Sequence, residues 1–145
     1  MPGKSPRSAL GSSTAVEDYL ERIRELIDSK GYARVVDIAS ALKISQASVT
    51  NMVQRLGAEG LLKYEKYRGL VLTRAGEKVA RDIAHRHKLL TDFLKLLGLK
   101  ERVIYHDVEG MEHHISRPTL RAIKALTEQL RRRPGMVAKV ESAVA

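Results

Sequence analysis

A pair of short helices in the first half of the chain constrains its fold most strongly. Residues 36–42 have the apolar spacing of a short helix, residues 43–45 form a tight turn, and residues 46–56 form a second helix. Ser45 stands where an N-terminal cap is needed, because its hydroxyl can accept a bond from an amide of the first turn. Two short helices joined by so tight a turn predict a helix-turn-helix.

A β-hairpin is predicted directly after these helices. Two short apolar runs, 61–66 and 70–73, flank the tripeptide 67–69. This tripeptide ends in Gly69, which suits the positive φ that a hairpin turn requires. A helix-turn-helix followed at once by a hairpin is a winged helix, and the hairpin is its wing.

The outer face of the second helix carries polar side chains that suit base edges in a DNA major groove. These candidate DNA-binding residues are Gln46, Ser48, Thr50, Asn51 and Arg55. Lys66 and Arg68 of the hairpin add positive charge for phosphate contacts. The alternative for the two helices is a plain helical hairpin with a polar outer face. The alternative for the β-hairpin is a basic strand edge whose charges only prevent aggregation. The combination of motifs favours double-stranded DNA as a partner.

The charge balance points the same way. The chain has a net charge of +9, and the stretch from Lys43 to Ala75 alone carries six basic and two acidic residues. Such a balance predicts a polyanionic partner. A membrane surface is disfavoured, because no run of about 18 apolar residues exists and no basic amphipathic anchor is evident. With no cysteine and no signal peptide in the polar first residues, we expect a cytoplasmic protein without disulfides or thiolate metal sites.

The rest of the chain is predicted to be helical, with an aliphatic core, so the fold class is mainly α. A helix begins at Thr14 and ends at Gly31, and a long helix runs from Thr73 to Gly98. Its apolar second half would suit a subunit interface. A further helix leads into a last one that starts at Pro118. The expected organisation is a flexible arm at 1–13, a winged helix-turn-helix domain at 14–74, a helical metal-binding and dimerisation domain at 75–133, and a C-terminal tail at 134–145.

The segment 107–114 carries the chemistry that the winged helix does not explain. If it is helical, Glu109, Glu112 and His113 share one face, because residues three and four apart are neighbours on a helix. Two carboxylates and an imidazole are half of a site for a divalent ion such as manganese, iron or zinc. The alternative is a solvated acidic face, and Gly110 weakens the helical prediction. No zinc-protease signature is present, so a metal here does not imply catalysis.

Taken together, the motifs resemble the manganese transport regulators of the diphtheria-toxin-repressor family. The resemblance runs from about Thr14 to Leu130 and rests on five segments, which are 17–21, 30–35, 64–73, Arg86-His87 and 107–114. It implies a dimeric winged-helix repressor with a helical dimerisation domain. Such a repressor binds a palindromic operator when it is loaded with metal, and it shuts down metal-uptake genes.

The resemblance also implies a ligand set, which is Asp18, Glu21, His87, Glu109, Glu112 and His113. These six would hold two Mn(II) ions per subunit, bridged by Glu109 and Glu112, and four carboxylates would balance two divalent cations. His85, His106 and His114 match no ligand position and are expected at the surface or behind the ligands.

Oxygen ligands at Asp18 and Glu109, where iron-responsive relatives have sulfur, suit manganese, although other divalent ions can bind as tightly. Because the sequence ends soon after the last predicted helix, we expect it to lack the third domain of the iron branch. Three alternatives remain open: a metal-independent winged-helix regulator, an iron-responsive regulator of the same family, and a small di-metal hydrolase. No nucleophile or spare general base beside the cluster supports the hydrolase. The start of the second helix departs from the family pattern, because it has no Lys or Arg before Arg55.

Overall fold

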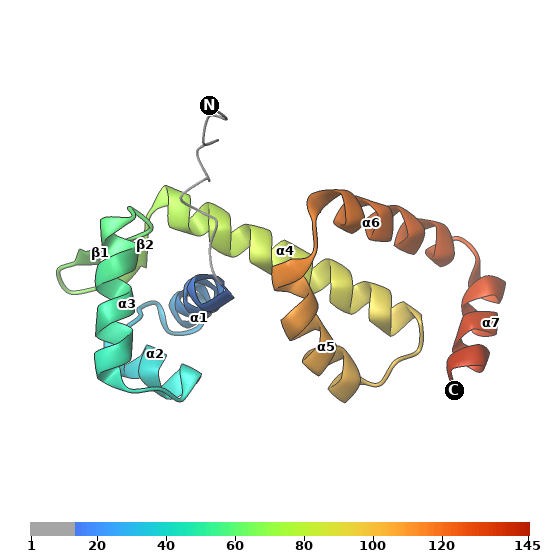
Figure 1. Ribbon diagram of the computed structural model, residues 1–145, viewed down its shortest axis with the longest axis horizontal. Coiled ribbons are helices and arrows are strands. Elements are labelled where there is room, and N and C mark those ends of the chain that lie inside the picture. Colours follow the sequence, from blue (N-terminus) through green and yellow to red (C-terminus); the bar gives the residue numbers. More distant parts are fainter. Residues whose placement is uncertain (1–13) are drawn as a thin grey trace, which may run out of the picture. The chain divides into compact units, whose positions relative to one another are not determined.

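The computed structural model describes residues 14–145, so the arm predicted at 1–13 lies outside the described residues. The chain divides into two compact units, one that ends at Asp82 and one that covers Ile83–Ala145. Most described residues lie in helices, and one two-stranded sheet completes the fold (Figure 1), which confirms the mainly α class. No helix within 14–145 is long and apolar enough to span a membrane.

The first unit is a winged helix-turn-helix, as predicted. Its elements are α1 (Thr14–Lys30), α2 (Val35–Leu42), α3 (Gln46–Ala58), β1 (Leu62–Glu65), β2 (Gly69–Leu72) and the start of α4 (Arg74–Leu96). The core is aliphatic, because each helix turns one apolar stripe inward. Its largest fully buried side chains are Leu20, Ile23, Ile38, Val49, Leu56 and Leu61. Figure 1 shows α2 beside α3, with the hairpin next to α3.

The turn between α2 and α3 forms as the sequence predicted. Lys43 adopts a left-handed conformation with φ 56°, and its amide bonds back to α2. The Ser45 hydroxyl then accepts a hydrogen bond from the amide of Ser48 at 3.1 Å, which satisfies one of the free amides at the start of α3. The direction of α3 is therefore set by its cap.

The wing is a short antiparallel hairpin in which Leu62 pairs with Leu72 and Glu65 with Gly69. Gly69 has the predicted positive φ, 79°, although it opens β2 and does not close the turn. A Cβ at this position would lie 2.7 Å from the carbonyl oxygen of Ala33, so glycine is also required by space. Tyr67 at the tip has a positive φ of 74° as well, which the sequence did not indicate.

The second unit is all helical. It contains the second half of α4, α5 (Glu101–His114), α6 (Arg117–Arg131) and α7 (Pro134–Val144). The core consists of Leu90, Leu94, Ile104 and Val108, with partly buried neighbours from α4, α5 and α6. Much of the apolar second half of α4, which we expected to need a subunit interface, is thus covered within its own unit.

Residues 134–145, which we expected to form a C-terminal tail, contain a further helix, α7. Pro134 lies in the first turn of this helix, a position that suits proline because no amide donor is needed there. The following residues carry no further proline, and Met136 donates its amide to the carbonyl of Arg133 at 2.9 Å. The arginine run that precedes Pro134 therefore ends α6 without ending the fold.

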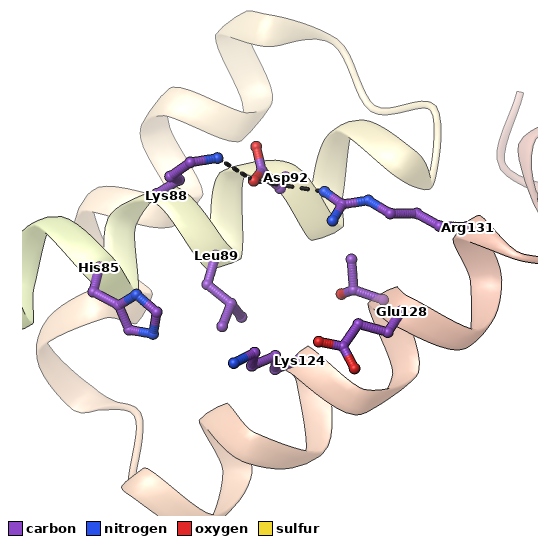
Figure 2. A pocket seen from close by; sticks show the side chains of 8 residues that line it. His85, Lys88, Leu89, Asp92, Lys124, Glu128 and Arg131 are labelled. Atoms are coloured by element: carbon purple, nitrogen blue, oxygen red, sulfur yellow. Dashed lines mark hydrogen bonds and ion pairs between the residues drawn. The ribbon is translucent and has the colours of Figure 1, made fainter.

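An ion pair joins α4 to α6 beside a hollow of about 240 Å³ (Figure 2). Lys88 donates to the carboxylate of Asp92 at 2.8 Å, and Arg131 of α6 lies 3.6 Å from the same carboxylate. The hydrogen bond from Lys88, with the positive charges of Lys88, Arg131 and Lys95, lowers the pKa of Asp92 against the opposing effect of burial. A carboxylate whose pKa is lower in the folded state stabilises the fold above its unfolded pKa and loses this effect as the pH falls.

We therefore expect Asp92→Asn to lower the free energy of unfolding at about pH 7 by roughly 0.2–1 kcal/mol, the range for partly exposed ion pairs. The difference between Asp92→Asn and the wild type should shrink as the pH falls through the native pKa of Asp92, where the wild-type carboxyl also becomes neutral. Urea denaturation of both proteins across the acidic range measures this. A difference that stays constant over the whole pH range would contradict the role given to this ion pair.

Candidate metal centre and nucleic-acid interface

The segment 107–114 is helical and continues α5, so Gly110 does not interrupt it. Glu112 lies at the centre of a cluster of nitrogen and oxygen atoms. One of its oxygens, Oε2, is 2.8 Å from Nδ1 of His87 on α4, and the other, Oε1, is 3.5 Å from Nε2 of His113. The Glu112 side chain is fully buried, and that of His113 is only 2% exposed. A buried carboxylate between two imidazoles is not the solvated acidic face that we considered as an alternative.

The donor set of this cluster fits a divalent cation. Carboxylate oxygen and imidazole nitrogen are ligands for manganese, iron and zinc, and the described residues contain no thiolate that would favour a softer ion. Residues of the second unit that could hold a metal are therefore His87, Glu112 and His113, together with the half-buried Glu109 one turn earlier on α5.

The other two predicted ligands lie on α1 in the first unit. Asp18 and Glu21 are half-buried and three residues apart, so they share a face of that helix. The three histidines that match no ligand position, His85, His106 and His114, are all exposed, as expected.

The predicted DNA-reading residues form the exposed side of α3 and the wing. All seven are exposed, while Val49 and Leu56 of α3 are buried. These seven residues are Gln46, Ser48, Thr50, Asn51, Arg55, Lys66 and Arg68. Arg55 and Arg68 pair with neighbouring glutamates, Glu59 at 3.3 Å and Glu65 at 3.2 Å. Exposed ion pairs of this kind contribute little free energy. Either guanidinium can therefore leave its glutamate and contact a phosphate at a small cost in free energy.

Two wing residues were missed as candidates for DNA contact. Tyr64 and Tyr67 are strongly exposed, Tyr67 to 90%, and the ammonium group of Lys66 lies 5.3 Å from the centre of the Tyr67 ring. Tyrosine near a hairpin normally indicates packing against a sheet, so no sequence signal marks these rings as exposed. The positive φ of Tyr67 is a conformation that non-glycine residues adopt at a cost, and it occurs often at functional sites.

Comparison with known proteins supports the division into a DNA-binding and a metal-binding part. Residues 12–70 match the family model described as iron dependent repressor, N-terminal DNA binding domain. Residues 73–136 match the model described as iron dependent repressor, metal binding and dimerisation domain.

Similar proteins include two bacterial regulators. The HTH-type transcriptional regulator MntR of Lysinibacillus sphaericus is 48% identical over 128 residues, which cover 88% of this chain and 92% of that protein. The regulator of the same name from Bacillus subtilis is 53% identical over 105 residues, which cover 72% of this chain and 74% of that protein. Among solved structures, ScaR with bound Zn²⁺ has a TM-score of 0.70 at 32% identity over 78% of this chain. This chain spans 53% of the ScaR chain.

A winged helix-turn-helix joined to a metal-binding and dimerisation domain defines a metal-dependent, DNA-binding transcriptional regulator and not an enzyme. The chain belongs to the iron-dependent repressor family, the diphtheria-toxin-repressor family that its motifs resemble. Both the metal-independent regulator and the hydrolase are thereby set aside.

Proposed function

We propose that this protein is a manganese-responsive repressor of manganese-uptake genes. It acts in the cytoplasm as a homodimer on a palindromic operator. The observation that carries the proposal is the fully buried carboxylate of Glu112 between the imidazoles of His87 and His113, a nitrogen and oxygen donor set. The relatives named MntR and a solved structure described as the manganese regulator SloR, at 28% identity and a TM-score of 0.69, support manganese over iron.

The proposed ligands are His87, Glu109, Glu112 and His113 from the second unit, with Asp18 and Glu21 from α1. The last two rest on the motif in α1 and on the family match. Two Mn(II) ions per subunit would balance the four carboxylates. Bound metal supplies the positive charge without which these carboxylates repel one another.

Metal binding controls DNA binding in this proposal because ligands come from both units. The DNA-reading α3 belongs to the first unit. Of the ligand-bearing helices, α4 extends into the second unit and α5 lies entirely within it. A dimer on a palindromic operator needs its two recognition helices about 34 Å apart, one turn of DNA. A cation that binds this arrangement more tightly than others shifts the equilibrium towards it, and a coupling of about 1–3 kcal/mol is typical.

The test is fluorescence anisotropy of a labelled promoter fragment from the protein's own manganese-uptake gene. Protein is titrated with and without Mn(II), and with Fe(II) or Zn(II), at one fixed salt concentration. We expect a gain in affinity with Mn(II) that the other ions do not match. Equal affinity with and without metal would overturn the metal switch, and an equal response to Fe(II) would favour the iron-responsive alternative.

Arg68 at the wing tests the DNA interface. Arg68→Ala should weaken binding to specific and unrelated DNA alike, because a phosphate contact carries no sequence information. It should also make the slope of log affinity against log salt shallower by about 1.8 for the dimer, because each of its two subunits loses one phosphate contact worth about 0.9. The matched control is Arg102→Ala, which removes the same charge from an exposed position on α5. An unchanged salt slope in Arg68→Ala would exclude Arg68 from the interface.

A further inference from the structure

Two consecutive residues of α4 bind the same residue of α5. His87 contacts the carboxylate of Glu112 at 2.8 Å, and Arg86 donates from its guanidinium nitrogen Nη1 to the main-chain carbonyl of Glu112 at 3.3 Å. Successive side chains on a helix point about 100° apart, so both can reach one residue only if it lies between them. Glu112 is therefore held at its backbone and at its side chain by one helix.

The contact with Arg86 lies where α5 needs a donor. Glu112 is in the last turn of α5, which ends at His114, so the amide four residues further on lies outside the helix. Carbonyls at this end also carry partial negative charge, which a cation stabilises. Ile115 donates its amide to the carbonyl of Met111, one residue before Glu112. Arg86 donates to the carbonyl that follows, that of Glu112 itself. Arg86 thus caps the end of the helix from a neighbouring one.

We propose that Arg86 is a positioning residue for the metal centre. By fixing the Glu112 carbonyl on α4, Arg86 fixes where α5 ends, and with it the carboxylate of Glu112 and the adjacent imidazole of His113. A glutamate has several rotatable bonds, and a ligand that is already ordered loses less freedom when a cation binds. This inference rests on the proposed function, because it requires that Glu112 and His113 are ligands.

Two other roles of Arg86 predict different results. If Arg86 only stabilises the fold, its loss lowers the thermal stability of the metal-free protein and leaves metal affinity unchanged at temperatures where the protein is folded. If its charge acts mainly by repelling a bound cation, its loss raises metal affinity. Positioning predicts a loss of affinity, and groups that orient ligands typically change it by about 10–100-fold.

The experiment compares wild type with Arg86→Met, Arg86→Lys and the control Arg102→Met. Methionine keeps much of the side chain's apolar length and removes its hydrogen-bond donors and charge. Lysine keeps the charge but donates from a single nitrogen in place of the planar guanidinium. Mn(II) affinity is measured by EPR of the free aqueous ion in competition with a chelator. Thermal unfolding of the metal-free proteins is followed by circular dichroism.

We expect Arg86→Met to bind Mn(II) about 10–100-fold more weakly than wild type, Arg86→Lys to lie between them, and Arg102→Met to match wild type. Unchanged or higher affinity in Arg86→Met would overturn the inference alone, since wild type would still bind. If wild type itself binds no Mn(II), the proposed function fails and the inference with it. Should Arg86→Met not fold, Arg86→Lys decides, because wild-type affinity in this variant would overturn the role of the guanidinium.

Discussion

Replacing Glu109 and Glu112 together by Gln is expected to abolish the manganese-dependent gain in operator affinity, which typical coupling energies place at about 5–150-fold. An amide has nearly the shape of a carboxylate, but it carries no charge and is a poor ligand for a hard cation. The change removes two of the four proposed carboxylates, including the fully buried one of Glu112. Anisotropy titrations with and without Mn(II) measure the effect, and light scattering shows whether the variant is still a dimer.

The matched control is Glu101→Gln with Glu128→Gln. Both positions are exposed, on α5 and α6 of the same unit, so the pair removes the same charge away from the cluster. The control should keep the wild-type response to Mn(II). A Glu109→Gln/Glu112→Gln protein that still gains affinity with Mn(II) would refute the ligand assignment. A variant that no longer forms a folded dimer would move the test to Glu109→Gln alone, for which we expect a reduced response.

The elements that were predictable from the sequence are those fixed by local chemistry. Ser45 caps α3 and Gly69 has a positive φ because hydroxyl capping and left-handed backbone each depend on a few neighbouring atoms. The cluster on α5 was also foreseeable, because helical spacing alone places Glu109, Glu112 and His113 on one face. Gly110 did not prevent this helix, since a single glycine costs about 1 kcal/mol.

What the sequence could not predict depends on contacts between distant segments. The bond from Arg86 to the Glu112 carbonyl joins residues 26 apart, and nothing near Arg86 indicates that a helix ends beside it. Tyr67 is strongly exposed and also has a positive φ, a conformation that local preference disfavours at a non-glycine residue. The helix α7 was missed because Pro134 is compatible with both an end and a start of a helix, and only the following residues decide.

Gly76→Ala should destabilise the first unit markedly, although alanine is the better helix former. Gly76 is buried near the start of α4, and a Cβ there would collide with the carbonyl oxygen of Leu61 and lie 3.3 Å from Cδ2 of Leu72. The backbone at Leu61 cannot easily withdraw, because its carbonyl accepts the amide of Thr73 at 3.1 Å. The Thr73 hydroxyl also donates to the carbonyl of Gly60 at 2.6 Å and accepts the amide of Gly76 at 3.1 Å. Overpacking of this kind costs about 1–3 kcal/mol or more.

Gly57→Ala isolates the steric effect from helix propensity. Gly57 lies in α3 of the same unit, and the nearest atom to an added Cβ is the Leu62 carbonyl oxygen at 3.9 Å, an ordinary contact. Alanine should therefore stabilise α3, by up to about 1 kcal/mol. Urea denaturation of the metal-free proteins should separate the two variants by about 1–4 kcal/mol, the sum of overpacking and propensity. Equal stability would mean that the start of α4 is not held against Leu61, and that the wing and α4 are joined more loosely than these hydrogen bonds indicate.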